Sequence, residues 1–317
     1  MPNNEQTAQP KIAVIGATSV DITIREAPDW MGHTGRDIYT RESMHALEAP
    51  IEMGLGGNGG AAAYVLGKLG LPVELLTSIG TDAPGQLVRG WLQQAGVRSI
   101  ETMPADSTMV ALSAVDGQGK RQGCLQHPGA KLDWLVSASD TEAAWLLVMV
   151  HSLVTPDELQ TVHQTMRKFR QADRLIALDS GMGWILNRAE PKRIHALWGH
   201  AHVVIGTLDE LSHWTGKKDP ESVAQDILGH GAAHVVIKMG ADGASYQSAV
   251  YAFSHQPAIS IARSDRSIGA GDAFAGALVG SLATGQPLPI AVTNAQHVAA
   301  QVVESGRGVL AISPVNS

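Results

Sequence analysis

Short apolar runs recur along the chain, and longer stretches with apolar positions every three or four residues separate them. The runs predict buried strands at 11–16, 73–79, 146–150, 175–178, 203–205 and 235–238. The longer stretches predict helices at 59–70, 83–95, 156–171, 188–198, 220–230 and 270–284. Strands that are apolar throughout and alternate with helices indicate a doubly wound α/β fold, with a mostly parallel sheet covered on both faces.

Two segments, about 20–53 and 98–127, do not follow this alternation. Both contain β-prone, partly polar stretches with little helical pattern. Within the second segment, 109–115 and 121–126 predict two strands joined by a turn at 116–119. We expect both segments to form a small β-sheet lid on a domain that covers 11–317, preceded by a flexible tail at 1–10.

Composition narrows the classes of partner. Of 317 residues, 44% are hydrophobic and 17% are charged, and the formal net charge of −7 lacks the basic field that nucleic acid or anionic lipid would favour. Cys124 is the single cysteine, so no intramolecular disulfide forms. The polar N-terminus and the short apolar runs predict a cytoplasmic protein with neither a nucleic-acid nor a membrane partner.

The segment Gly269-Ala270-Gly271-Asp272 opens a predicted helix whose Phe274 begins an apolar face. Glycines permit a tight turn, and the amides at the start of a helix attract anions such as phosphate. Asp272 would lie in the first helical turn, where a carboxylate can accept a proton from an attacking hydroxyl group. Taken alone, the motif favours an acidic residue that only stabilises a helix start.

A second glycine-rich segment, 54–60, leads into the predicted helix at 59–70. Its spacing differs from the dinucleotide-binding fingerprint, and the chain contains no Gly-x-x-x-x-Gly-Lys-Ser/Thr loop. Taken alone, the segment is explained equally well by close helix packing through small residues.

Together the two motifs, in this order and separation, resemble the two signatures of the PfkB (ribokinase) family of carbohydrate kinases, and the resemblance covers about 11–310. It implies a ribokinase-like fold, ATP as the phosphate donor, Mg²⁺ as the required ion and a hydroxymethyl group of a sugar as the acceptor. It also implies a monovalent cation beside the nucleotide and a homodimer formed through the lid.

The resemblance further assigns residues to roles. Asp272 would be the catalytic base, and the amides of Gly269, Ala270 and Gly271 would hold the transferred phosphoryl group. The acceptor would contact Asp21, Gly56, Gly57 and Asn58. ATP would contact Thr207, Lys238, Gly240, Gly243 and Asn294, while Glu210 would organise the water shell of Mg²⁺.

The chain departs from the family pattern at four positions: Arg266, Ile268, Ala61 and Thr207. These departures leave two alternatives open, a nucleoside kinase of the same family and a catalytically impaired regulator that binds a sugar or nucleotide. Only three phenylalanines and four tyrosines occur, which favours a sugar over a stacked base. Among the 13 histidines, His200 and His202 form the only close pair, and the spacing predicts no zinc site.

Overall fold

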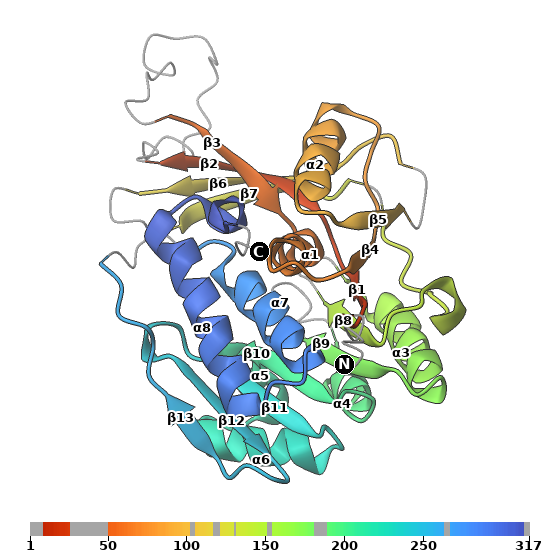
Figure 1. The fold of residues 1–317 in the computed structure, drawn as a ribbon, viewed down its shortest axis with the longest axis vertical. Coiled ribbons are helices and arrows are strands. Elements are labelled where there is room, and N and C mark those ends of the chain that lie inside the picture. The colour runs from red at the N-terminus through yellow and green to blue at the C-terminus, as the bar shows by residue number, and fades with distance from the viewer. Residues whose placement is uncertain are drawn as a thin grey trace, which may run out of the picture.

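The computed structural model describes residues 9–25, 50–101, 105–116, 121–129, 131–150, 154–180, 189–262 and 267–313. These residues form a nine-stranded sheet flanked by helices and a separate four-stranded sheet (Figure 1). The predicted α/β class, with a mostly parallel main sheet and a small second sheet, is confirmed.

The nine-stranded sheet has the order β13-β12-β11-β10-β9-β8-β1-β4-β5, and its strands from β11 to β5 are parallel. β12 and β13 join antiparallel at one side. The strands are β1 (Ile12–Ile15), β4 (Val73–Thr77), β5 (Arg98–Glu101), β8 (Trp145–Met149), β9 (Leu175–Asp179), β10 (Val203–Thr207), β11 (His234–Lys238), β12 (Ala244–Ser248) and β13 (Ser254–Gln256). All six predicted apolar runs coincide with strands of this sheet.

Alternate residues of each central strand point to opposite faces, and both faces are apolar. In β1, Ile12 and Val14 pack into one core, whereas Ala13 and Ile15 pack into the other. The first core lies under α1 (Asn58–Lys68), α2 (Ala83–Gln94), α7 (Ala270–Ala283) and α8 (Leu288–Ser305). The second lies under α3 (Pro156–Gln171), α4 (Pro191–Trp198), α5 (Leu208–Thr215) and α6 (Pro220–Gly229).

The six predicted helix ranges correspond to α1, α2, α3, α4, α6 and α7 within a few residues. α5 and α8 lay outside those ranges, although Asn294 was expected on a late helix and does lie in α8. Of the helices that the structure describes, none has the length and apolar character needed to cross a membrane.

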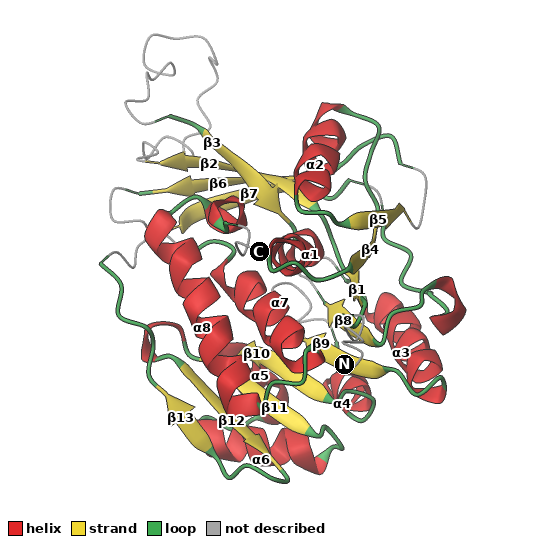
Figure 2. Cartoon of the chain, in the orientation of Figure 1, coloured by secondary structure: helices red, strands yellow, loops and turns green. Residues whose placement is uncertain are grey.

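The four-stranded sheet has the order β3-β2-β6-β7 and lies beyond the N-terminus of α1 (Figure 2). Its strands are β2 (Ser19–Arg25), β3 (Glu52–Gly56), β6 (Met109–Val115) and β7 (Arg121–His127). They come from the two segments predicted as lid, but β5 lies within 98–127 and pairs with β4 in the large sheet. Residues 1–8, 26–49 and the turn residues 117–119 lie outside the described part of the chain.

Small residues allow α1 to pack closely against both β1 and α7. A Cβ atom added at Gly59 would lie 2.6 Å from the backbone of Gly16, and one at Gly276 would lie 2.8 Å from the carbonyl oxygen of Ala62. Backbones approach this closely only where no side chain intervenes. The packing therefore brings the start of α1 and the start of α7, which carry the two glycine motifs, to the same part of the molecule.

Candidate active site

A cavity of about 900 Å³ lies between the four-stranded sheet and the N-terminal end of α7. Ligands of doubly wound folds bind at the carboxyl edge of the strands, and this cavity includes the residue that ends β10. The predicted site residues that line it are Asp21, Gly56, Thr207, Glu210, Gly269 and Asp272. They come from both sheets and from the helix that the second glycine motif opens.

Gly269 forms the N-cap of α7 with a φ of 82°, in the left-handed region that favours glycine. The Ala270 amide donates to the Ser267 carbonyl at 3.1 Å, which closes the turn. The amides of Gly271 and Asp272 follow in the first helical turn, where an α-helix has no internal acceptor for them. The turn thus presents amide donors and the positive end of α7 to the cavity.

Asp272 is partly buried at this helix start, and burial raises the pKa of its carboxyl group to about 7. The positive charge of Lys238 opposes this rise, while the negative charges of Asp179, Asp21 and Glu210 add to it. A carboxyl group with a pKa near neutrality can both accept and release a proton under physiological conditions.

Lys238 ends β11 and donates from Nζ to Asp179 Oδ2 at 2.8 Å. Asp179 is buried and Lys238 nearly so, with 4% and 13% of their side chains exposed. Burial alone would lower the pKa of Lys238, but Asp179, Glu210 and Asp272 together raise it. Lys238 is therefore a firmly protonated cation among carboxylates at the carboxyl edge of the sheet.

On the acceptor side, the carboxylate of Asp21 lies directly over the backbone of Gly56. A Cβ atom at Gly56 would fall 1.9 Å from Asp21 Oδ1, so no other residue type fits this position without moving Asp21. Ser19 Oγ donates to the same carboxylate at 2.8 Å. Gly57 has a φ of 71° and approaches the backbone of Ala17 and Thr18.

Asn58 is occupied with the protein itself. Its Nδ2 donates to the carbonyl of Val150 at 3.2 Å, and its Oδ1 accepts from the Gly59 amide at 2.8 Å. These bonds tie the start of α1 to the end of β8. The contact between Asn58 and an acceptor stays a prediction.

Thr207 and Glu210 form a reciprocal capping box at the start of α5. Thr207 Oγ1 accepts from the Glu210 amide at 3.3 Å, and Glu210 Oε2 accepts from the Thr207 amide at 2.8 Å. Glu210 can both cap α5 and act in the site, because while capping the helix it still lines the cavity and raises the pKa of Asp272.

Four residues expected near ATP do not line the cavity, and Lys238, described above, is one of them. Gly240 and Gly243, with φ values of 60° and 99°, form the turn between β11 and β12. Asn294 on α8 donates from Nδ2 to Ser281 Oγ on α7 at 2.8 Å. Their contact with nucleotide stays a prediction. Arg266 lies outside the described residues, whereas Ile268 lines the cavity.

One feature of the cavity was not predicted. Arg25, at the end of β2, forms a two-point ion pair with Glu52 on β3, with both N–O distances at 2.8 Å. Arg25 Nη2 also donates to the carbonyl of Gly306 at 3.2 Å. This contact joins the small sheet to the end of α8 across 281 residues of sequence. The sequence contains a β-prone segment around Arg25 and a glycine turn at Gly306, but nothing in it indicates that the two come into contact.

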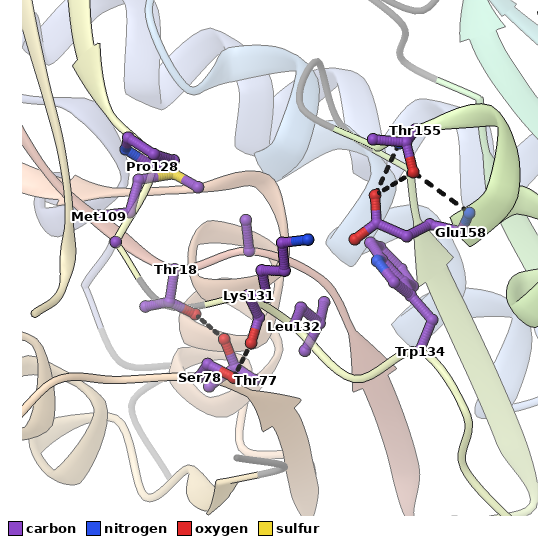
Figure 3. Close-up of a pocket in the computed structure, with 12 residues that line it drawn as sticks. Thr18, Thr77, Ser78, Met109, Pro128, Lys131, Leu132, Trp134, Thr155 and Glu158 are labelled. Atoms are coloured by element: carbon purple, nitrogen blue, oxygen red, sulfur yellow. Dashed lines mark hydrogen bonds between the residues drawn. The ribbon is translucent and has the colours of Figure 1, made fainter. Parts of the chain in front are cut away.

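A second cavity, of about 130 Å³, lies beyond the carboxyl ends of β1 and β4 (Figure 3). The side chain of Lys131 extends across it, and its floor includes hydroxyl groups of Thr18 and Thr77, whose oxygens lie 2.8 Å apart. None of the predicted site residues lines this cavity. The carboxylates and the α7 turn belong to the larger cavity, which is therefore the candidate active site.

Comparison with known proteins agrees with this geometry. The profile of the pfkB family carbohydrate kinases matches residues 9–313. The chain is 25% identical over 268 residues to a 2-dehydro-3-deoxygluconokinase of Bacillus subtilis, covering 80% of this chain and 81% of the relative. It is 27% identical over 192 residues to a fructokinase of Rhizobium leguminosarum, covering 58% of each.

Solved structures show the same fold. Ribokinase of Arabidopsis thaliana, complexed with ribose and ATP, superposes with a TM-score of 0.75 at 20% identity and 96% coverage of both chains. Ribokinase of Thermotoga maritima gives a TM-score of 0.73, also at 20% identity and 96% coverage of both chains. The match along nearly the whole chain, together with a cavity that joins both glycine motifs, identifies the protein as a sugar kinase of the pfkB carbohydrate kinase family.

Proposed function

We propose that the protein transfers the γ-phosphoryl group of ATP to a hydroxymethyl group of a sugar or sugar-like acceptor, with Asp272 as the base. The observation that carries this proposal is the position of Asp272. It lies in the first turn of α7, beside amide donors, and its carboxyl group has a pKa of about 7. In-line phosphoryl transfer needs an oriented hydroxyl group, a proton acceptor and charge stabilisation, and this turn offers the last two together.

The acceptor would be oriented by Asp21, whose carboxylate lines the same cavity and interacts electrostatically with Asp272. A carboxylate can accept two hydrogen bonds from neighbouring hydroxyl groups, which suits a sugar. Asp272 would then take the proton from the attacking hydroxyl, while the first-turn amides of α7 and the ammonium group of Lys238 stabilise the phosphoryl oxygens. Lys238 reaches this turn, since a Cβ atom at Gly271 would lie 3.7 Å from its Nζ.

Magnesium fits the donor set of the cavity. Glu210 lines it and supplies carboxylate oxygens, the hard ligands that Mg²⁺ prefers, and Mg²⁺ retains water ligands that a single carboxylate can hold. Bound Mg²⁺ would neutralise charge on the phosphate groups. The proposed homodimer through the small sheet and the monovalent cation rest on the family resemblance alone.

The cavity lining favours a sugar over a nucleoside as the acceptor. Of the described residues that line it, none is aromatic, so they provide no surface on which a base would stack. The relatives are named for acidic sugars and fructose, which places ketoses and sugar acids first in a screen.

The test is ADP release from Mg²⁺-ATP with ketoses, aldoses, sugar acids, sugar phosphates and nucleosides as acceptors. We expect release with at least one sugar or sugar acid and a phosphorylated hydroxymethyl group in the product. Turnover of nucleosides alone would replace the sugar assignment with the nucleoside kinase. Tight sugar binding without ADP release from any acceptor would support the regulator instead.

A further inference from the structure

Three side chains that the kinase site does not use converge at the ends of two helices. His195 lies in the last turn of α4, and Asp226 and His230 lie at the end of α6, four residues apart. One ligand atom from each side chain lies within 4.8 Å of the other two. The three residues are 35 positions or fewer apart but belong to different helices, so their spacing in sequence matches no metal motif.

Hydrogen bonds to backbone carbonyls fix the tautomer of both imidazoles. His195 Nε2 lies 3.0 Å from the carbonyl oxygen of Trp214, and His230 Nδ1 lies 2.8 Å from that of Asp226. A carbonyl oxygen only accepts, so each of these nitrogens carries the proton. The lone pairs of His195 Nδ1 and His230 Nε2 therefore remain for a ligand. Metal-binding histidines characteristically have this arrangement, in which the second nitrogen donates to a carbonyl.

The electrostatic surroundings favour a cation. The Asp226 carboxylate belongs to the group, and the C-terminal ends of α4 and α6 add their negative dipole ends. The neighbouring pair His163 and His200 differs, although its Nε2 atoms lie 3.1 Å apart. Burial lowers the pKa of both, and the positive charge of Arg167 lowers it further. A cation at that pair would meet arginine rather than a carboxylate.

We propose that His195, Asp226 and His230 bind a divalent transition-metal cation, with Zn²⁺ as the best fit and water as the fourth ligand. Two imidazoles and one carboxylate are a common zinc ligand set. Tetrahedral bonds of about 2.0–2.2 Å place ligand atoms about 3.3–3.5 Å apart. When the ion binds, the three side chains would have to close from their present spacing, within 4.8 Å, to that value. Asp226 and His230 are 28% and 37% exposed, so the ion enters directly from solvent.

The proposed site has no part in phosphoryl transfer. α4 and α6 end where the chain turns into β10 and β11, so the site lies at the amino edge of the large sheet. The catalytic residues lie at the carboxyl edge, and a five-residue strand such as β10 spans about 16 Å between the two edges. A bound ion would cross-link the two helices and stabilise the domain. This inference does not depend on the identity of the acceptor.

The test uses the full-length protein after chelator treatment, titrated with ZnCl₂ in a calorimeter without nucleotide. We expect one equivalent to bind, and the Tm to rise by about 4 °C at a zinc concentration near 100 times Kd. Co²⁺ should give the visible absorption of a four-coordinate site. It should also quench fluorescence from Trp198, whose ring stacks on His195 with centroids 4.7 Å apart.

Asp226→Asn keeps the shape of the side chain and removes its charge, and we expect it to weaken zinc binding at least about 100-fold without lowering the Tm of the zinc-free protein. His230→Asn, at an exposed position, should do the same. Two controls should bind zinc as the parent protein does: His163→Asn, from the arginine-flanked pair, and Asp272→Asn, from the kinase site. Unchanged affinity in Asp226→Asn, or loss of binding in either control, would overturn the assignment.

Discussion

The two edges of the large sheet differ in the ionisable groups that the fold collects there. At the carboxyl edge, Asp179 and Lys238 end the strands that flank β10, with Asp179 buried and Lys238 nearly so. At the amino edge, His202 precedes β10 and His234 begins β11. Burial lowers the pKa of both histidines, to about 4 for His202. The same parallel sheet thus concentrates charge at one edge and keeps His202 and His234 neutral at the other.

The two edges differ in whether their buried ionisable side chains keep their charge. At the carboxyl edge the carboxylates keep negative charge that Lys238 compensates only in part, and this contributes to the raised pKa of Asp272. A general base requires a carboxyl group with such a pKa. At the amino edge, burial favours the neutral imidazoles of His202 and His234, so these two side chains avoid the cost of a buried charge. Changes at the first edge should therefore alter catalysis, and changes at the second should alter stability.

Asp272→Asn should produce the largest effect. Loss of the base should lower kcat by about 10³-fold, the usual contribution of general base catalysis. The Tm at pH 8 should not fall, because burial disfavours the ionised carboxylate that the amide replaces. The matched control is Asp157→Asn, which also removes a carboxylate from a first helical turn, in this case an exposed one of α3. If the two variants had the same kcat, Asp272 would not be the catalytic base.

Lys238→Met should come next, with a loss of about 100-fold in kcat/KM, comparable to removing one donor from an anion hole. The positive charge of Lys238 lowers the pKa of Asp272, so its removal should shift the acid limb of the pH–rate profile upward from about 7. Asp179 would also remain buried without its cation, at a stability cost of about 3 kcal/mol.

Adding Asp179→Asn to Lys238→Met separates the two consequences. The double variant should recover stability in chemical denaturation, because the buried negative charge that Lys238 balanced is removed with it. It should not recover activity. Recovery of both would mean that Lys238 acts only by balancing Asp179.

His202→Asn tests the amino edge through pH. The pKa of His202 is lowered from 6.5 to about 4, chiefly by burial and secondly by Arg170, and its Nδ1 accepts from the Ile176 amide at 2.9 Å. Stability from the neutral form is complete above pH 6.5 and is lost as the pH falls toward 4. The substitution should flatten the pH dependence between 7 and 4.5 by about 2 kcal/mol. Denaturant titrations at pH 7 and pH 4.5 measure the free energy of unfolding, and His213→Asn, at an exposed position, is the control. If His202→Asn left the pH dependence of stability unchanged, the lowered pKa of His202 would be contradicted.

Arg25→Gln should have the smallest effect, about a fivefold rise in KM, because a partly exposed ion pair contributes about 1 kcal/mol or less. It removes the contact between β2 and Gly306 across the cavity. Arg89→Gln is the matched control, since Arg89 likewise joins a glutamate, Glu101, and a backbone carbonyl, but outside the cavity. A similar KM change in both variants would argue against a role for the contact at the cavity.

The central strands were predictable because their faces are both buried, so Ile12 to Ile15 are apolar without interruption. β12 and β13 were not, because their sequences, ASYQS and SHQ, are polar and lie at the side of the sheet. Asp272 was predictable because glycines and the helix pattern surround it locally. The pair Lys238–Asp179 was not, since 59 residues separate its members and only the strand order places their ends together. The same reason concealed the grouping of His195 with Asp226 and His230.

The packing of α1 against α7 has a consequence for synthesis of the protein. β1 and α1 leave the ribosome early, but Gly276, which packs against Ala62 of α1, is synthesised more than 200 residues later. A Cβ atom added at Gly276 would lie 2.8 Å from the carbonyl oxygen of Ala62. At about 5–20 residues per second, a nascent chain waits on the order of ten seconds or more with the apolar face of α1 uncovered. Before α7 is synthesised, the nascent chain lacks both Asp272 and the amide donors of the α7 turn. The chain can therefore become active only after its last helices are made. Chaperone dependence during translation should accordingly be greatest before α7 emerges.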